Sequence, residues 1–165
     1  MQIALPYQFA DDEQEASTAV AGLLVHLDTI YGFALTLTGD ADAAAELTEE
    51  VFGRARDDRW GTLGGHGLRD RLLARCVAVF CETFSAHGSV SAPGRTPVEQ
   101  PPATTLGAVL RELPWDERAA IALVDQLHLS YAAGAAVLGV DVPEFRTLLH
   151  HGRAVLLVAY RVATR

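Results

Sequence analysis

Residues 127–145 have the sequence Leu127-His-Leu-Ser-Tyr-Ala-Ala-Gly-Ala-Ala-Val-Leu-Gly-Val-Asp-Val-Pro-Glu-Phe145, which predicts two helices joined by a tight turn. Ser130 is a favourable N-cap for a short helix over about 132–138. Gly139 can adopt the left-handed conformation that ends this helix. A short helix, a glycine-containing turn and a second helix are typical of a helix-turn-helix.

The second helix of this stretch is expected to be long and amphipathic. Asp141 lies at its start, Glu144 follows three residues later as in a capping box, and Pro143 is tolerated in the first turn. Apolar residues then recur every three or four positions, so they share one face of the helix. The residues of this face are Val142, Phe145, Leu149, Gly152, Leu156 and Ala159.

The composition of the whole chain favours an all-α fold. Half of the 165 residues are hydrophobic, alanine is abundant, and clusters of β-branched residues are short. No apolar run reaches the roughly 18 residues that a membrane span needs. The first residues lack the basic region and apolar core of a signal peptide. We therefore expect a cytoplasmic protein that does not associate with a membrane.

A proline-rich segment divides the chain into two helical units. Residues 88–104 contain Pro93, Pro97, Pro101 and Pro102 among Gly, Ser, Ala and Thr, a composition typical of a linker. It separates a front unit, residues 11–87, from a back unit, residues 105–165. Hydrophobic periodicity predicts front-unit helices over about 12–37, 41–57 and 68–86, and back-unit helices over about 105–113 and 114–127 ahead of the helix-turn-helix.

Glycine occurs in two segments of the front unit, the first predicted helix and residues 60–67. Gly22 and Gly32 weaken the first helix by about 1 kcal/mol each relative to alanine, which allows a break near Gly32. The glycine-rich segment 60–67 is interpreted as a plain loop, because it lacks the Gly-Lys-Ser/Thr ending of a phosphate-binding loop and no strand precedes it.

The charge of the chain is strongly asymmetric. The formal net charge is −8, and all thirteen basic residues are arginine. Residues 1–88 hold fourteen acidic residues and six arginines, whereas residues 89–165 hold seven of each. Non-specific binding of nucleic acid depends on neutralising phosphates with basic side chains. The acidic front unit suits a protein partner with a basic or apolar surface better than it suits DNA.

No arrangement of reactive side chains predicts an enzyme, a metal site or a cofactor. The sequence contains no nucleophile–base motif and no phosphate loop. Cys76 and Cys81 lie five residues apart on one expected helix and are interpreted as reduced structural residues. His150 and His151 are adjacent on a helix, so they do not face a common metal site.

Several short motifs, in this order along the chain, resemble the ECF (extracytoplasmic-function) sigma factors of bacterial RNA polymerase. The front unit contains Leu37-Thr-Gly-Asp40, Ala44-Ala-Glu-Leu47 and Glu49-Glu-Val-Phe-Gly-Arg-Ala55. That family usually has Leu-Thr-Gly-Asp, Ala-Glu-Asp-Leu and Gln-Glu-x-Phe-x-Arg-Ala. The back unit contains Leu110-Arg-Glu-Leu-Pro-Trp-Asp-Glu-Arg-Ala119 and, further on, Val137-Leu-Gly-Val140, which look like the family's region 4.

The resemblance implies two small helical domains, a region 2-like front unit and a region 4-like back unit, and a function in transcription. In the family, region 2 docks on the clamp helices of core RNA polymerase and opens promoter DNA. Region 4 places its second helix in the major groove. The positions that match the polymerase-binding helix are Glu46, Leu47, Glu49, Glu50 and Phe52. The positions that fall on the DNA-recognition helix are Arg146, His150, His151 and Arg153.

The chain departs from the family's pattern at its expected DNA-contacting positions. Arg71 stands where the promoter-opening helix usually has tryptophan, and the end of that helix, Phe80-Cys-Glu-Thr-Phe-Ser-Ala-His87, contains no arginine. Opening of DNA uses aromatic rings that stack on bases and cations that hold the strand. Asp141 and Glu144 stand where the recognition helix approaches phosphates, and Leu148 replaces an expected arginine.

These observations leave two hypotheses for function. The first is an atypical working sigma factor that binds core RNA polymerase and promoter DNA. The second is a sigma-like protein that works through protein contacts without opening a promoter. In that case it is a partner or decoy of an anti-sigma factor, a polymerase-bound regulator or a dimer. The acidic front unit and the altered promoter-opening helix favour the second hypothesis. The usual activity of the family favours the first.

Overall fold

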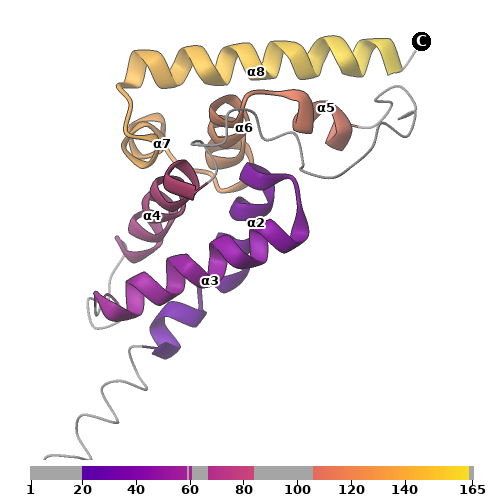
Figure 1. Cartoon of the computed structure of the whole chain (residues 1–165). Coiled ribbons are helices and arrows are strands. Elements are labelled where there is room, and N and C mark those ends of the chain that lie inside the picture. The colour runs from indigo at the N-terminus through magenta and orange to yellow at the C-terminus, as the bar shows by residue number, and fades with distance from the viewer. Residues whose placement is uncertain (1–19, 59, 61–66, 84–105, 164–165) are drawn as a thin grey trace, which may run out of the picture.

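All regular secondary structure in the described part of the chain is helical, which confirms the predicted all-α fold. The computed structural model describes residues 20–58, 60, 67–83 and 106–163 (Figure 1). Residues 20–24 end a helix that precedes α2. The elements that follow are α2 (Leu27–Thr38), α3 (Ala41–Asp57), α4 (Leu68–Thr83), α5 (Leu106–Glu112), α6 (Trp115–Ile121), the π-helix η3 (Ala122–Gln126), α7 (Tyr131–Leu138) and α8 (Val142–Ala163).

Helices α2 and α3 are joined by a turn whose local sequence explains both helix ends. Gly39 has a φ of 71° and donates its backbone N–H to Leu35 O, which ends α2 in the left-handed conformation. The side chain of Asp40 accepts hydrogen bonds from the N–H groups of Asp42 and Ala43, each at 3.0 Å, and so caps α3. The predicted helix over 41–57 is confirmed with the same bounds.

The first long helix is interrupted earlier than the sequence indicated. The break lies at Val25–His26, and Gly32 lies inside α2. A Cβ atom at Gly32 would have no heavy atom within 4 Å, so nothing in the packing forces the chain to bend at that residue. Apolar side chains on both sides of the turn at 25–26 are exposed, among them Leu24 and Leu27.

The helix that precedes the helix-turn-helix ends in an irregular turn. It begins after Pro114, runs through α6 and becomes the π-helix η3 before Leu127. Among the non-glycine residues that the structure describes, His128 alone adopts a left-handed conformation, with a φ of 56°. The sequence predicted the continuous helix to Leu127, but it did not predict the π-helical turn, because no side-chain pattern distinguishes the two helix types.

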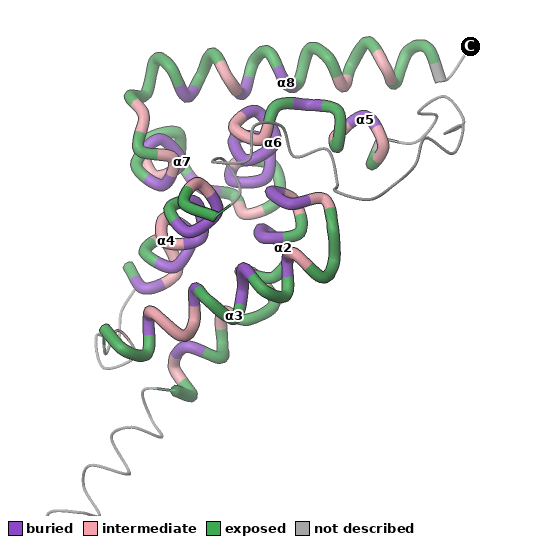
Figure 2. Tube along the Cα trace, in the orientation of Figure 1, coloured by how far each residue is buried: buried purple, intermediate pink, exposed green. Residues whose placement is uncertain are grey.

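The front and back units pack against each other around one continuous hydrophobic core. In Figure 1, α4 lies between α3 of the front unit and α7 of the back unit, and α6 lies above α2. Buried residues face the centre of this arrangement in both units (Figure 2). Phe33, Leu72 and Phe80 of the front unit belong to the same cluster as Leu123 and Phe145 of the back unit. The predicted linker over 88–104 and the end of the third predicted helix lie outside the described residues.

No helix of the described residues is long and apolar enough to cross a membrane. In the same residues, no group of three or more His, Cys, Asp or Glu side chains is arranged to hold a metal ion.

Candidate polymerase and DNA interfaces

The helix-turn-helix forms through the capping residues that the sequence indicated. Ser130 Oγ accepts a hydrogen bond from the N–H of Ala133 at 3.2 Å and caps α7. Gly139, with a φ of 71°, ends it. Asp141 Oδ1 then accepts from the N–H of Glu144 at 2.7 Å, which starts α8. These caps fix the turn between α7 and α8 and therefore the direction in which α8 leaves it.

Two glycines allow the helices of the back unit to approach closely. A Cβ atom at Gly134 of α7 would overlap the ring of Phe145, with the ring atom Cε2 at 2.9 Å. A Cβ atom at Gly152 of α8 would lie 2.8 Å from Ile121 Cδ1. Phe145 is fully buried as a result. Of the apolar face that the sequence predicted for α8, Phe145, Leu149 and Gly152 are buried and Leu156 and Ala159 are half-buried, whereas Val142 is exposed.

The candidate DNA-contacting residues divide into two pairs with different surroundings. Arg146 and His150 are exposed and line a shallow groove of about 570 Å³ on the outer side of α7 and α8. Arg153 also lines this groove, together with Tyr131 of α7 and with Val142, Pro143, Thr147 and Leu149 of α8. It lies on the N-terminal half of α8, which is the half that a helix-turn-helix presents to base edges.

His151 and Arg153 are held by acidic side chains of the preceding helix. His151 Nδ1 lies 2.6 Å from Oε1 of Glu117, a residue that is only 7% exposed. Arg153 makes two contacts with Asp125, one of them from Nε to Oδ2 at 3.1 Å, and hydrogen bonding to Asp125 raises the pKa of Arg153. These pairs tie α8 to α6 and η3. DNA contact by His151 or Arg153 would have to compete with bonds already formed within the chain.

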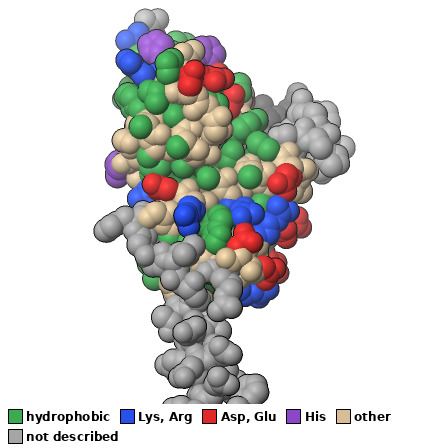
Figure 3. Space-filling model, turned by 90° about the vertical axis from the view of Figure 1, so that its left-hand side faces the viewer, with side chains coloured by type: hydrophobic (Ala, Val, Ile, Leu, Met, Phe, Trp, Pro, Cys, Tyr) green, Lys and Arg blue, Asp and Glu red, His purple; other side chains and the backbone are tan. Residues whose placement is uncertain are grey.

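The charges around the helix-turn-helix do not form a continuous basic surface in the described residues. Figure 3 shows basic, acidic and histidine side chains intermixed near the top of the face that contains α7 and the start of α8. Asp141 and Glu144 are exposed at the start of α8, one turn before Arg146. Leu148 packs partly against the core. This face therefore offers phosphates few cations and two nearby carboxylates.

The five candidate polymerase-binding residues of α3 lie in three different environments. Leu47 is only 1% exposed and belongs to the core, so it is not available for contact with a partner. Glu50 is exposed but pairs at 2.7 Å with Arg54, which also pairs with Glu82 of α4. Glu46 is exposed one turn earlier on the same side as Glu50.

Glu49 and Phe52 lie on a different side of α3 and line a groove with α2. We call this feature the α2–α3 groove; its volume is about 610 Å³ and its lining is mostly apolar. The wall opposite α3 carries large side chains that are partly exposed. These are Val20 (40%), Leu24 (54%), Leu27 (41%) and Tyr31 (37%). A row of exposed apolar side chains in a concave surface is typical of a binding site for another macromolecule.

The sequence did not identify the α2 wall of this groove as a surface. Leu24, Leu27 and Tyr31 occur at helical spacing together with Ile30 and Ala34, so the pattern does not separate the two groups. Ile30 and Ala34 are fully buried. The width of the apolar stripe could have indicated this surface, because a helix that buries only one face does not need leucine or tyrosine on a second face.

The comparisons with known proteins agree with this architecture. Residues 104–156 match the family model "Sigma-70, region 4". The chain is 29% identical over 153 residues to the ECF RNA polymerase sigma factor SigE of Mycolicibacterium smegmatis, and the match covers 79% of this chain and 57% of SigE. The chain is thus similar to ECF sigma factors, and it spans little more than half the length of SigE.

A solved structure also shares the fold of this chain. The sigma factor RpoE from Bartonella quintana, in complex with the anti-sigma factor NepR, superposes with a TM-score of 0.68 at 21% sequence identity. The superposition covers 92% of this chain and 98% of RpoE. Because it includes most of both chains, the similarity extends over the front and back units together and not only over the region 4 domain.

Proposed function

We propose that this chain acts in transcription as a sigma factor-like protein that docks on core RNA polymerase through the α2–α3 groove. The observation that carries the proposal is the coincidence of two independent features. Glu49 and Phe52 are among the positions that match the polymerase-binding helix of the ECF sigma factors. The same two residues line the mostly apolar α2–α3 groove. The charged residues of its lining are Asp28, Glu49 and Arg56, so the groove suits an amphipathic partner helix.

DNA contact is assigned to a smaller surface than the sequence suggested. We propose that Arg146 and His150 contact DNA through the groove they share with Tyr131, whereas His151 and Arg153 hold α8 on α6 and η3. All four residues are exposed, and the support for this division is that His151 and Arg153 have acidic partners, whereas none of the ion pairs of the described residues includes Arg146 or His150. Asp141 and Glu144 weaken the attraction of this surface for phosphate.

A second candidate function is binding of an anti-sigma factor without promoter activity. The observation that favours it is that the structural relative RpoE is bound to the anti-sigma factor NepR. The acidic front unit and the mixed charges at the start of α8 are compatible with this candidate.

Two double variants test the proposed polymerase and DNA contacts. Each variant serves as the control of the other. Leu24→Arg with Glu49→Lys places cations in the α2–α3 groove, and we expect the affinity for core RNA polymerase to fall about tenfold or more. Arg146→Ala with His150→Ala should leave that affinity unchanged. In a selection from a random pool of DNA duplexes, performed with the polymerase-bound chain, this second variant should lose the sequence motif that the wild type enriches.

The outcomes separate the candidate functions. If the groove variant binds polymerase as well as the wild type, the assignment of the groove is wrong. If the wild type binds polymerase but enriches no DNA motif, the assignment of the DNA-contacting surface is wrong, and the result favours the anti-sigma candidate function. Reversal of Glu46 and Glu50 to lysine provides a further comparison, because these residues lie outside the groove and their reversal should have a smaller effect than that of Leu24 and Glu49.

A further inference from the structure

The C-terminal half of α8 carries an exposed row of valines. Helix α8 packs on α5, α6 and α7, and its buried or half-buried residues in this half are Gly152, Leu156 and Ala159. Three valines, spaced i, i+3 and i+7, lie outside this contact, and their exposed fractions rise towards the end of the helix. We call them the α8 stripe: Val155 (36%), Val158 (61%) and Val162 (71%). This spacing is the one by which an amphipathic helix anchors itself in an apolar groove.

The charge of the same segment restricts what can cover the α8 stripe. Residues 145–165 contain four arginines and no acidic residue. Arg153 and Arg161 flank the stripe within the helix. A surface that is apolar and has acidic surroundings therefore complements this segment, whereas a basic surface would repel it.

The α2–α3 groove has both of these properties. Its lining is mostly apolar, with Leu24 and Leu27 on the α2 wall. Its charged lining residues are two acids, Asp28 and Glu49, and one base, Arg56. Around it, residues 27–58 hold eight acidic residues and two arginines. The groove therefore matches the α8 stripe in polarity and its surroundings match the arginines of α8 in charge.

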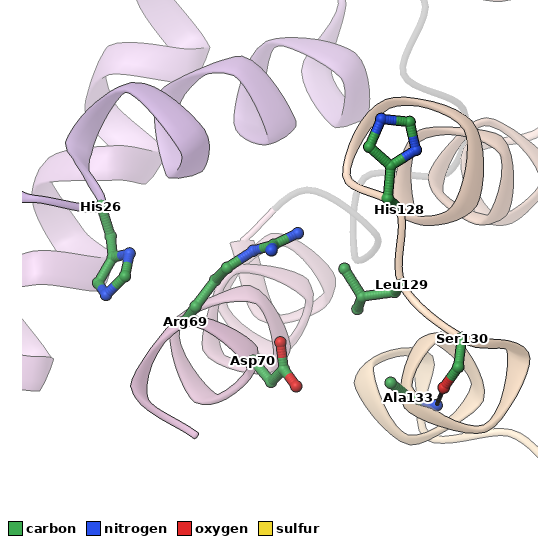
Figure 4. Close-up of a pocket in the computed structure, with 7 residues that line it drawn as sticks. All are labelled: His26, Arg69, Asp70, His128, Leu129, Ser130 and Ala133. Carbon is green, nitrogen blue, oxygen red and sulfur yellow. Dashed lines mark hydrogen bonds between the residues drawn. The ribbon is translucent and has the colours of Figure 1, made fainter. Parts of the chain in front are cut away.

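The cavity beside α4 is a less suitable acceptor for this helix. It has a volume of about 490 Å³, and His26, Arg69, Asp70 and His128 line it. Figure 4 shows the guanidinium group of Arg69 extending from α4 towards the segment of His128, where Arg69 donates to Leu127 O. A cation and two imidazoles in the lining do not complement a basic, apolar helix.

Within one copy, α8 lies too far from the α2–α3 groove to fill it. In Figure 1, α8 lies along one side of the molecule, and α3 lies on the opposite side, beyond α6 and α2. We propose that the α8 stripe of one copy docks in the α2–α3 groove of a second copy. Two such contacts either close a symmetric pair or extend into a longer assembly, according to the angle between the copies.

This contact makes self-association a competitor of polymerase. The contact between copies does not depend on the proposed function, but the competition rests on it, because the same groove is assigned to core RNA polymerase. A groove that holds α8 of another copy is closed to polymerase. The fraction of chains able to dock should therefore fall as the concentration of the chain rises.

Sedimentation equilibrium of complementary variants tests the contact with the chain alone. The mass of the wild type should rise with concentration to that of a dimer or a larger assembly. Leu24→Arg with Glu49→Lys removes the groove, and Val158→Glu removes the stripe, so each variant alone should associate about tenfold or more weakly. Their mixture should form a dimer and nothing larger, because one intact groove and one intact stripe remain. Leu157→Glu, about 100° or more around the helix from each valine, should associate like the wild type.

Three results would overturn the proposal. One is a wild-type chain that is monomeric at about 1 mM, where even a millimolar Kd gives associated protein. Another is association of the groove variant alone, which would mean that α8 pairs with α8. The third is a mixture of the two variants that stays monomeric. Val162→Glu, at the most exposed valine of the stripe, replaces Val158→Glu if circular dichroism shows that the latter does not fold.

Addition of core RNA polymerase to the associated wild type tests the competition. We expect polymerase to dissociate the assembly and to bind single copies. If polymerase binds and the copies stay associated with it, the competition is refuted while the proposed docking stands. If polymerase does not bind the chain at any concentration, the proposed docking fails, and the contact between copies is still judged from the variants alone.

Discussion

At the scale of single residues, side chains that look alike in the sequence have different roles because of their partners. Arg146 is exposed in a groove, Arg153 is paired with Asp125, and Arg118 is buried against backbone carbonyls. No local pattern separates these three arginines, because the partners of Arg118 and Arg153 are distant in sequence. The buried, structural role of Cys76 was predictable, since free cysteine behaves as a small hydrophobic residue at a position that shares the period of its apolar neighbours.

Cys76 should make the stability of the protein fall at alkaline pH. Burial raises the pKa of the Cys76 thiol from 9.0 to about 12, so the thiol of the folded protein stays protonated where that of the unfolded chain ionises. Its contribution is complete below pH 9 and is lost as the pH rises towards 12. Between pH 8 and pH 10.5, we expect a loss of about 2 kcal/mol in the free energy of unfolding from this group.

Urea denaturation of matched variants isolates this effect of Cys76. Cys76→Ala lowers stability at both pH values through the cavity it creates, but it should lack the alkaline loss. Cys81→Ala, at a half-buried position, should retain the wild-type pH dependence. Equal alkaline losses in all three proteins would show that Cys76 ionises in the folded state as readily as in the unfolded one.

At the scale of the helices, caps and close contacts determine how the elements meet. The sequence predicted the ends of α3, the Ser130 and Asp141 caps and the Gly139 turn, because each depends on residues within one turn of the chain. It predicted neither the turn at Val25–His26 nor the π-helical turn of η3, which depend on packing between distant elements. For the same reason, the sequence did not predict the α2–α3 groove.

The contact between α7 and α8 predicts opposite effects for two glycine substitutions. Gly134→Ala places a methyl group against the buried ring of Phe145, and we expect an overpacking cost that exceeds the gain in helix propensity, with a net destabilisation of about 1–2 kcal/mol. Gly32→Ala, in a helix and free of neighbours within 4 Å, should stabilise by about 0.5–1 kcal/mol.

Thermal unfolding compares the two glycine variants with the wild type. We expect the melting temperature to fall for Gly134→Ala and to rise for Gly32→Ala. A rise for both would mean that Phe145 moves aside without cost and that the close approach of α7 and α8 does not depend on glycine.

At the scale of the whole molecule, two units with separate proposed contacts form one body. The motifs predicted both units and their order, but the sequence did not predict whether they pack together. The reason is physical: the junction consists of a few contacts between residues far apart in the chain, such as Phe80 with Trp115 and Arg118 with Leu37. In this closed body the α2–α3 groove stays exposed, so the proposed docking on polymerase does not require the two units to separate first.

Site-specific photo-crosslinking to core RNA polymerase tests the docking surface most directly. A photoreactive phenylalanine analogue replaces either Leu24 in the α2–α3 groove or Val158 on α8; both positions are exposed and apolar, at 54% and 61%. The account predicts a crosslink from position 24 to the polymerase subunit that carries the clamp helices, and none from position 158. A crosslink from position 158 alone, or none from either position with polymerase bound, would contradict it.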